Sequence, residues 1–371
     1  MEFDFIIVGA GSAGCVLASR LSENGRHTVL VLEAGGSDRR FWIQTPIGYG
    51  KIFYDPGVNW MYTTEENPGL AGRQSYWPRG KVLGGSSSIN AMVYIRGQHG
   101  DYDDWSAMGN EGWGWQDVLP YFRRAETNAR GGDTWRGDSG PLYVDDPSAS
   151  YHPLNRRFID AAIACGLPEN SDFNGAEQEG AGLYQITARG GVRMSAARAY
   201  LRPAMARSNV TVRTHAHVSR VLFSGHTATG VEYLHEGRIQ QATARREVIL
   251  CGGAINTPQV LQLSGIGPGH LLQEHGIPVL SDKPVVGSNL QDHLSVTHYY
   301  RSRVPTINNV LSPWWGKLLA GLQYVLFRRG QLSLSVNQAG GFFRSNPQRE
   351  RPNLQLYFCA LTYTKAPPGV R

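Results

Sequence analysis

The chain has 371 residues, which is enough for two domains or for one large domain with a lid. Its formal net charge of +6 comes from scattered basic residues and includes no block of five or more like charges, so we expect no nucleic-acid partner. The four cysteines have no CxxC spacing, which predicts buried free thiols in a reducing compartment and no metal site.

No apolar run is long enough to span a bilayer, and because a nucleotide-binding pattern begins already at Phe5 we expect no signal peptide. We therefore expect a cytoplasmic protein. The basic surface leaves open a loose association with an anionic membrane.

The stretch from Phe5 to Gly35 predicts a strand, a helix and a second strand. Phe5–Val8 is an apolar run that leads into Gly9-Ala10-Gly11-Ser12-Ala13-Gly14, and a helical pattern follows to Leu21. The second strand, Thr28–Leu32, ends at Glu33. Glycines at these three positions allow a tight turn, a close backbone approach to a pyrophosphate and close helix–strand packing, and the acid suits ribose hydroxyls. The pattern predicts dinucleotide binding.

A long loop and a second glycine-rich stretch follow. Residues 34–75 have little periodicity, which predicts a lid or a cofactor-covering excursion. In Arg79–Gly97 the single Gly80 and the pair Gly84-Gly85 accompany Ser86-Ser87-Ser88 among apolar residues. A surface linker is the alternative, but the interleaved apolar residues favour a loop whose amides and hydroxyls face a ligand.

Further along, the patterns predict helices over Leu154–Cys165 and Trp314–Phe327 and a strand over Leu183–Thr187. Short alternating runs between Val210 and Cys251 predict a β-meander that returns to the nucleotide sheet. The last of these strands leads through Gly252-Gly253 into a helix that ends at Gly265.

Three stretches, Gly9–Gly14, Arg79–Gly97 and Gly253–Gly267, together resemble the glucose–methanol–choline (GMC) family of FAD-dependent oxidoreductases. The resemblance covers about the first 300 residues well. It implies an α/β fold with α+β excursions: a Rossmann-like FAD-binding sheet with a three-stranded β-meander, plus the start of a substrate domain.

The family pattern implies an FAD-binding domain over residues 1–300, with a cofactor loop over about 36–97 and a substrate-side excursion over about 150–205. Residues 301–371 then begin a substrate-binding domain that is incomplete. The ending Pro367–Arg371 resembles mid-domain sequence rather than a natural stop, so we expect a truncated chain or the N-terminal part of a longer enzyme.

The cofactor could be NAD(P) or FAD, because one fingerprint serves both. The chain has a single strand–GxGxxG–helix unit and a large Gly/Ser loop, which favours FAD. Some family members attach the flavin to a histidine where this chain has Ile89, so we expect non-covalent FAD. The resemblance assigns Val218 to the adenine side. The predicted cofactor-binding residues are Gly9, Gly11, Ser12, Ala13, Gly14, Glu33, Ala34, Val82, Gly85, Ser86, Asn90, Ala91, Met92, Val93, Val218 and Gly253.

The resemblance implies oxidation of a primary alcohol, choline-like or aliphatic, to an aldehyde by hydride transfer to flavin N5. The electron acceptor would be a quinone, a cytochrome or oxygen. The family's catalytic histidine lies in a segment beyond residue 371, and His99 and His293 are the nearest substitutes. Asp292 and His293 are expected to be structural.

Three alternatives concern the substrate and the activity. Gln338 stands where choline dehydrogenases carry Glu, which favours an uncharged alcohol over choline. A flavin-binding truncated chain without activity and an FAD-containing cyanohydrin lyase are the other two readings of the same pattern.

Overall fold

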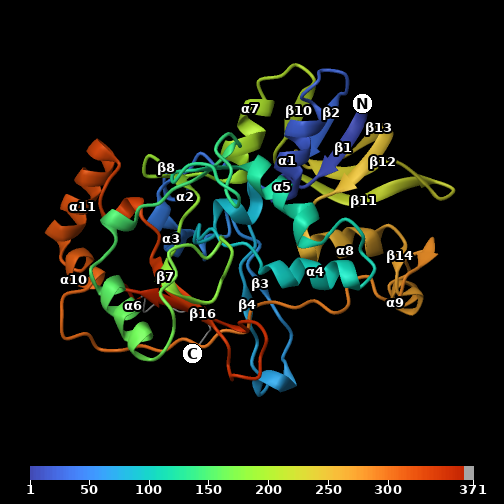
Figure 1. Ribbon diagram of the computed structural model, residues 1–371. Coiled ribbons are helices and arrows are strands. Elements are labelled where there is room, and N and C mark those ends of the chain that lie inside the picture. Colours follow the sequence, from blue (N-terminus) through green and yellow to red (C-terminus); the bar gives the residue numbers. More distant parts are fainter. Residues whose placement is uncertain (363–371) are drawn as a thin grey trace. The chain divides into compact units, whose positions relative to one another are not determined.

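The computed structural model describes residues 1–362, drawn as ribbons in Figure 1, and the ending predicted at Pro367–Arg371 lies outside this range. Contacts divide the chain into two compact units. Unit 1 contains residues 1–40, 51–90 and 195–297. Unit 2 contains residues 41–50, residues 91–194 and the chain from residue 298 onward. Each unit is therefore assembled from three separate segments.

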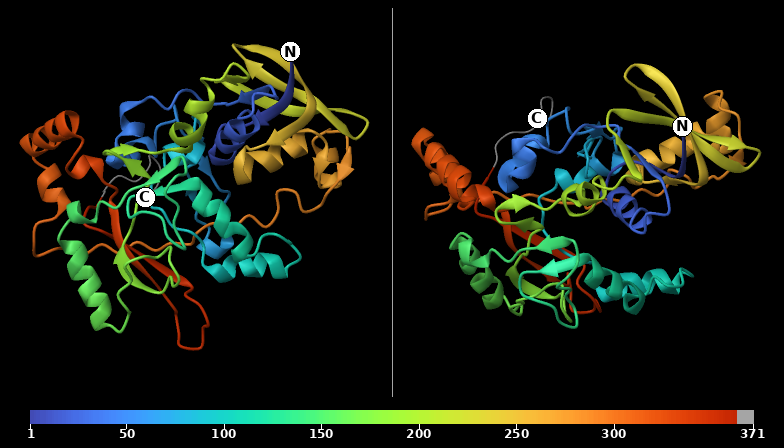
Figure 2. Two further views of the ribbon diagram at one scale, coloured as in Figure 1. Left: turned by 45° about the horizontal axis from the view of Figure 1, so that its top comes forward. Right: turned by 90° about the horizontal axis from the view of Figure 1, so that it is seen from above.

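Unit 1 is built on one six-stranded sheet with the strand order β10-β2-β1-β13-β12-β11. Figure 2 shows this sheet from two further directions. Strand β1 pairs in parallel with β2 and with β13, and β10 pairs in parallel with β2. The strands are β1 (Glu2–Val8), β2 (Val29–Leu32), β10 (Val210–Arg213), β11 (Ala216–Ser224), β12 (Thr227–His235) and β13 (Arg238–Leu250).

The central strands β1 and β2 are buried on both faces, as their continuous apolar runs predict. Ile6, Ile7, Leu30 and Val31 are all fully buried. The α/β fold class is confirmed, and β11, β12 and β13 form the three-stranded meander. Two details of that prediction are wrong. The run from Val210 forms β10, which pairs with β2 outside the meander.

The second wrong detail concerns β13 (Arg238–Leu250), because the two alternating runs Gln240–Thr243 and Val248–Cys251, which the sequence predicts as separate strands, form one continuous strand. Its first part pairs antiparallel with β12 and its second part pairs in parallel with β1. Thr243 belongs to both pairings, opposite Gly230 on one side and Glu2 on the other. A Cβ on Gly230 would lie 2.1 Å from the carbonyl oxygen of Ala242, so only glycine fits there.

Helices of unit 1 follow the parallel strands. Helix α1 (Ser12–Leu21) follows β1, and its buried residues include Cys15 and Ala18. Helix α8 (Gly253–Leu263) follows β13. The remaining elements of this unit are β3 (Tyr62–Thr63), η2 (Pro68–Leu70), β4 (Tyr76–Trp77), η3 (Gly85–Ser88), η5 (Ala197–Leu201), α7 (Arg202–Ala204), β14 (Ile266–Gly267), α9 (Gly269–Glu274) and β15 (Ser281–Asp282).

Unit 2 contains a three-stranded sheet with the order β17-β16-β7 and several helices. The predicted strand at Leu183–Thr187 is wrong in position, because β7 covers Gly180–Leu183. The predicted helix Trp314–Phe327 is confirmed as α11. The elements are α2 (Phe41–Gln44), η1 (Pro46–Gly48), α3 (Tyr49–Ile52), α4 (His99–Ala107), α5 (Trp115–Ala125), β5 (Glu126–Asn128), β6 (Leu142–Val144), η4 (Ser148–Ser150), α6 (Leu154–Ala164), β7, β8 (Ala188–Arg189), β9 (Val192–Arg193), α10 (Ile307–Leu311), α11, η6 (Gln331–Ser333), β16 (Asn337–Phe343) and β17 (Leu354–Cys359).

Two predictions from the whole sequence can be compared with the structure. The cysteines are free thiols, but only Cys15 is fully buried, whereas Cys165 is exposed at the end of α6. Over residues 1–362 the structure contains no helix long and apolar enough to cross a membrane.

A buried ion pair joins two segments of unit 2. The guanidinium of Arg96 contacts the carboxylate of Glu126, and both side chains are almost completely buried. Arg96 also donates to the carbonyl oxygen of Trp135 at 2.7 Å, and Glu126 accepts from the hydroxyl of Tyr94 at 2.9 Å and from the amide of Asn128 at 2.6 Å. Each charge therefore has several polar partners, as a buried charge requires.

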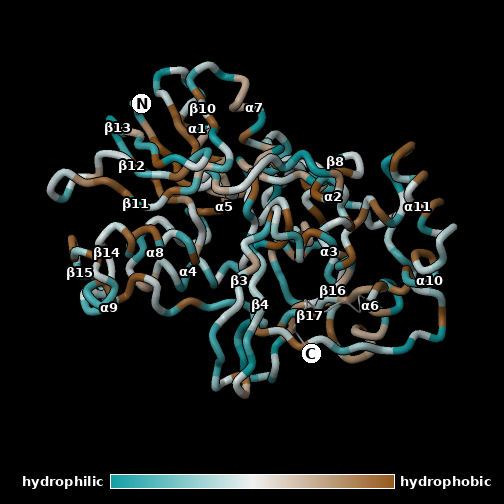
Figure 3. Tube along the Cα trace, turned by 180° about the vertical axis from the view of Figure 1, so that it is seen from behind, coloured by the Kyte–Doolittle hydropathy of each residue, from teal (hydrophilic) through white to brown (hydrophobic). Residues whose placement is uncertain are grey.

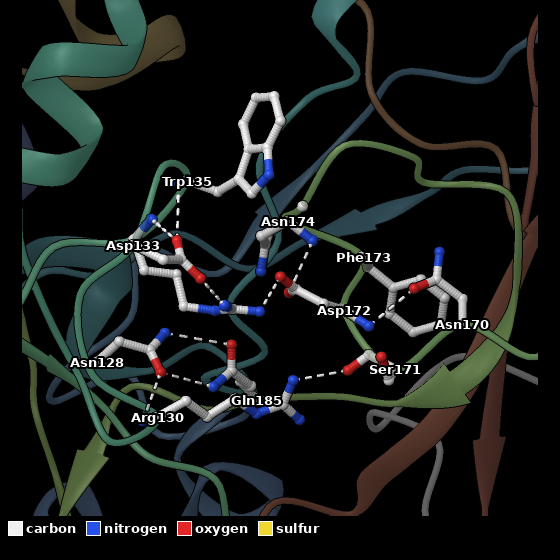
Figure 4. Close-up of polar contacts among 12 residues, drawn as sticks. Asn128, Arg130, Asp133, Trp135, Asn170, Ser171, Asp172, Phe173, Asn174 and Gln185 are labelled. Atoms are coloured by element: carbon white, nitrogen blue, oxygen red, sulfur yellow. Dashed lines mark hydrogen bonds and ion pairs between the residues drawn. The ribbon is translucent and has the colours of Figure 1, made fainter.

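Neighbouring polar side chains extend this network, as Figure 4 shows. Asn128 and Gln185 exchange hydrogen bonds through their amides. Arg130 donates to the carbonyl oxygen of Ser171 at 2.6 Å. These contacts connect the segment around β5 with residues on both sides of β7.

We expect the substitution Arg96→Met to lower the free energy of unfolding by about 3–5 kcal/mol, because it leaves the Glu126 carboxylate buried without its cation. The double substitution Arg96→Met with Glu126→Gln should recover part of this loss. Arg20→Met removes a solvent-exposed pair with Glu23 and is the control, with an expected change of at most about 1 kcal/mol. Urea unfolding followed by tryptophan fluorescence measures all three, and equal effects of the two single substitutions would contradict the prediction.

Candidate functional site

The glycine turn after β1 depends on the absence of side chains at two positions. Gly9 has a φ of +98°, and a Cβ there would lie 2.5 Å from the carbonyl oxygen of Cys251, at the end of β13. A Cβ on Gly14 would lie 2.0 Å from the carbonyl oxygen of Gly9. Gly14 therefore has the helix-packing role that the motif predicts. Gly11 is the N-cap residue of α1, so the first N–H groups of the helix have no partner within the helix.

The serine-rich loop lies directly against this turn. A Cβ on Gly85 would lie 2.8 Å from the Cα of Gly11, and the amide of Gly84 donates to the carbonyl oxygen of Ala10 at 2.7 Å. The amide of Asn90 donates to the carbonyl oxygen of Ser86 at 2.9 Å, one residue beyond Gly85. The structure thus brings the two glycine-rich motifs of unit 1 together.

The serine hydroxyls of this loop bond to the protein's own backbone. Ser87 Oγ donates to the carbonyl oxygen of Gly84 at 2.6 Å, and Ser88 Oγ donates to that of Leu83 at 2.7 Å. Ser86 Oγ accepts from the amide of Gly80 at 3.2 Å. The serines therefore help to fix the shape of the loop, and the predicted contact of this loop with a ligand stays a prediction.

Glu33 links the end of β2 to the glycine turn. One carboxylate oxygen accepts from the amide of Ala10 and the other from the amide of Gly35, both at 2.8 Å. Burial raises the pKa of this carboxyl above its ordinary value of 4.5, although the two N–H donors and the Lys81 ammonium act in the opposite direction. Each oxygen keeps one further lone pair for another donor.

Other predicted residues lie along the same edge of the sheet. Val82 forms a parallel bridge with Gly36, two residues after Ala34. The carbonyl oxygen of Glu33 accepts from the amide of Ala216 at 2.9 Å, which fixes the start of β11 and brings Val218 to this edge. Val218 itself is buried in the core of the sheet.

Gly253 begins α8 in a left-handed conformation, with a φ of +82° and open space at its Cβ position. It follows the end of β13 as α1 follows the end of β1. Since these strands are parallel neighbours, two helix N-termini lie at the same edge of the sheet, which is where open α/β sheets bind ligands.

The last predicted residues, Ala91, Met92 and Val93, belong to unit 2. Met92 has a φ of +63°, which is rare for a residue with a side chain, and its carbonyl oxygen accepts from the amide of Thr187 at 2.9 Å. The carbonyl oxygen of Ala91 accepts from Ser335 Oγ at 2.7 Å. Surrounding structure therefore holds a strained backbone in place, which is common at functional sites.

Sequence reasoning missed Gly35. A Cβ on this residue would lie 1.9 Å from the carbonyl oxygen of Lys81, so the backbone after β2 and the approach to the serine-rich loop are in direct contact. The glycine pair Gly35-Gly36 directly after Glu33 is the signal that could have identified this contact.

The two substitutes for the catalytic histidine lie in different surroundings, His99 in an aromatic stack and His293 exposed to solvent. The His99 ring stacks on Trp115 with 4.0 Å between ring centroids, and its Nε2 lies 3.2 Å from the carbonyl oxygen of Gly175. His293 follows Asp292, whose carboxylate forms an ion pair with Arg79 at 2.8 Å. This contact agrees with a structural role for Asp292.

The parallel sheet, the glycine turn and the buried acid at the end of the second strand define a dinucleotide-binding α/β protein. The family model "GMC oxidoreductase" matches residues 3–295, and the chain belongs to this family.

The relatives and solved structures agree with this assignment. The chain is 45% identical over 357 residues to an oxygen-dependent choline dehydrogenase of Photobacterium profundum, covering 96% of this chain and 63% of that protein. It is 44% identical over 367 residues to an alcohol dehydrogenase [acceptor] of Pseudomonas putida, covering 98% and 66%. A FAD-dependent oxidoreductase from Chaetomium thermophilum has a similar structure, with a TM-score of 0.83 and 34% identity over 92% of this chain and 61% of that one. The chain therefore spans slightly under two thirds of the length of these relatives.

We expect Gly85→Ala to destabilise unit 1 by about 1–3 kcal/mol, because the new Cβ would press on the Cα of Gly11. Gly225→Ala is the matched control, since Gly225 has a φ of +58°, close to the +53° of Gly85, but has no atom within 4 Å of its Cβ position. Urea unfolding measures both variants. The same loss in each would mean that backbone strain, and not the contact with Gly11, determines the effect.

We expect Glu33→Gln to destabilise the protein by about 1–3 kcal/mol near pH 4.5, because the NH2 group of glutamine cannot accept from a backbone N–H, whereas both oxygens of a protonated carboxyl can. The raised pKa means that folded Glu33 binds its proton more tightly than the unfolded chain does. The contribution of Glu33 to the free energy of unfolding is therefore complete below pH 4.5, and it is lost as the pH rises through the pKa of the folded protein. The difference in unfolding free energy between wild type and variant should narrow with rising pH, and a constant difference in denaturant titrations would contradict this.

Proposed function

We propose that this chain binds FAD non-covalently and forms the flavin-binding part of an enzyme that oxidises a primary alcohol to an aldehyde. The observation that carries the proposal is the contact of Gly85 with Gly11, which brings the serine-rich loop to the dinucleotide turn beside Glu33. The relatives' names support the same chemistry, because they include a choline dehydrogenase, an alcohol dehydrogenase and a FAD-dependent oxidoreductase.

The residues present fit an adenine dinucleotide. The unpartnered N–H groups at the start of α1, from Ser12, Ala13 and Gly14, suit a pyrophosphate. The Glu33 carboxylate is fixed by two amides and keeps lone pairs for ribose hydroxyls. We assign the adenine side to Ala34 and Val218 and the flavin ring side to Val82, Gly85, Ser86, Asn90, Ala91, Met92 and Val93, with Gly9, Gly11 and Gly253 shaping the turns.

FAD is favoured over NAD(P) because the chain has one dinucleotide fingerprint and a second, glycine- and serine-rich loop packed on it. When bound, FAD supplies a hydride acceptor for the carbinol carbon of the alcohol. The chain's own part is to hold and orient the cofactor. Ile89, at the position of the attachment histidine, has a buried hydrocarbon side chain that cannot form such a bond.

Removal of the hydroxyl proton needs a base that titrates near neutral pH. Among the described residues, His99 lies in an aromatic stack and His293 is exposed, so we assign the base to neither. The lyase alternative is not favoured, because the matched relatives are dehydrogenases. A flavin-binding chain without turnover of its own is the other alternative, and the dehydrogenase names of the relatives do not favour it either.

An uncharged aliphatic alcohol is the substrate that Gln338 favours over choline. Gln338 is buried, and its side-chain oxygen Oε1 accepts from the backbone N–H of His152 at 2.9 Å and from Asn155 Nδ2 at 2.7 Å. It contributes no negative charge for a quaternary ammonium group. The remaining partners we propose are an electron acceptor and an anionic membrane surface that attracts the basic chain.

The test is reconstitution with FAD. The purified chain should bind about one FAD per chain, release it on acid precipitation, and bind it about tenfold more weakly after Gly85→Ala but not after Gly225→Ala. Anaerobic addition of butanol should bleach the bound flavin faster than choline does. A colourless protein that does not take up added FAD would contradict the binding proposal. Flavin that stays with the precipitate would contradict the non-covalent one, and bound flavin that neither alcohol reduces would favour the chain without turnover.

A further inference from the structure

Helix α11 (Trp314–Phe327) presents apolar side chains to solvent along most of its length. Trp314 is 75% exposed, Leu318 is 53% exposed and Leu326 is 67% exposed. Brown, hydrophobic segments recur along this helix in Figure 3. The large exposed apolar residues of α11 are Trp314, Trp315, Leu318, Leu319, Leu322, Val325, Leu326 and Phe327. An exposed apolar face of this length indicates an interaction surface.

The opposite side of α11 is the one that packs on unit 2. Its buried residues are Gly316, Ala320 and Tyr324, spaced four apart on one stripe. A Cβ on Gly316 would lie 2.0 Å from the carbonyl oxygen of Val310 in α10, so the helix is held close by a small residue. Leu318 and Leu322, two positions on either side of Ala320, then point about 160° away from the buried stripe.

The pattern is therefore the reverse of an ordinary surface helix, whose apolar side faces the core. Packing through small residues holds α11 on unit 2, and its large apolar side chains remain exposed and available to contact a partner. Tyr324 anchors the inner side through an edge-to-face contact with Phe41, with 6.1 Å between ring centroids.

The charged residues in the chain segment that contains α11 are all basic, although Arg344 near the end of this segment is paired with Glu179. The sequence contains no Asp or Glu between Asp292 and Glu350. Lys317 lies on the helix, and Arg328 and Arg329 follow its last turn, where all three are exposed. The basic residues of this interval are Arg301, Arg303, Lys317, Arg328, Arg329, Arg344 and Arg349. A surface that carries negative charge is the complementary partner.

We propose that α11 is a docking helix that lies in the interface of an anionic lipid membrane, with Trp314, Leu318, Leu322 and Leu326 among the acyl chains. A wide apolar face with tryptophan at one end and arginine at the other is typical of helices that lie in the plane of the bilayer. At 14 residues, α11 is too short to span the bilayer. The inference rests on the membrane contact proposed above and names the surface that makes it.

The experiment is co-flotation of the FAD-loaded 371-residue chain with vesicles of phosphatidylcholine alone and of phosphatidylcholine mixed equally with phosphatidylglycerol. We expect binding to the anionic vesicles only. Leu318→Glu with Leu322→Glu should weaken that binding about tenfold or more. Arg328→Glu with Arg329→Glu should weaken it roughly tenfold at low salt and less at high salt, where the charges are screened.

The matched control is Leu234→Glu with Ile239→Glu, a pair of exposed apolar residues on the β12–β13 hairpin that should leave binding unchanged. Circular dichroism and thermal unfolding check that every variant is folded. Wild-type protein that ignores anionic vesicles would overturn the membrane contact itself. Wild-type binding that survives both charge and leucine substitutions would overturn only the assignment to α11.

A second measurement tests insertion rather than surface attraction. Lipids brominated in the acyl chain should quench part of the tryptophan fluorescence, and Trp314→Phe with Trp315→Phe should remove most of that quenching while the protein still binds. Unchanged quenching would overturn the proposal. So would sedimentation that shows self-association through α11 in a protein without vesicle binding, because a second copy of the chain would then cover this face.

Discussion

Close contact between stretches of main chain, possible only where a Cβ is missing, determines the architecture around the proposed flavin site. Gly14 lets α1 approach the turn at Gly9, and Gly85 lets the serine-rich loop approach Gly11. Gly35 lets the backbone after β2 approach the carbonyl oxygen of Lys81 in the same way. Three separate segments of the sequence therefore meet through bare backbone, and main-chain amides line much of this edge of the sheet.

The buried carboxylate of Glu33 converts this set of contacts into a defined site. It ties Ala10 in the glycine turn to Gly35 after β2, and its own carbonyl oxygen fixes the first residue of β11. Burial of the charge opposes folding, while the two amide donors offset that cost. The carboxylate therefore fixes the shape of the turn and keeps lone pairs for the ligand hydroxyl proposed above.

The sequence was sufficient for the elements that local patterns determine. The first strand–helix–strand unit and helix α11 both follow from apolar spacing and glycine positions. It could not reveal how three segments combine in each unit, because pairing between distant segments, as in the β7–β16 pair, leaves no local period. The strand predicted at 183–187 shows this limit, since pairing with β16 selected the residues just before it.

Side-chain roles were harder to predict than elements. Serines in a loop can face a ligand or bond to the backbone, and composition does not distinguish the two; here Ser87 and Ser88 bond to the backbone. The left-handed conformation of Met92 has no signature in the sequence, because most residues at such positions are glycine or asparagine. The cofactor set read from the motifs stays a prediction that reconstitution can test.

Strand β13 pairs with two different parts of the sheet, and these two parts can be disturbed separately. One half of it pairs with the meander and the other half with the nucleotide sheet, and the two halves meet at Thr243. A disturbance that loosens the β11–β12 hairpin can therefore stop at that residue, while the ladder that carries the glycine turn stays closed. The turn between β11 and β12 can therefore accept insertions and substitutions without a change in the glycine turn, which lies next to the far end of β13.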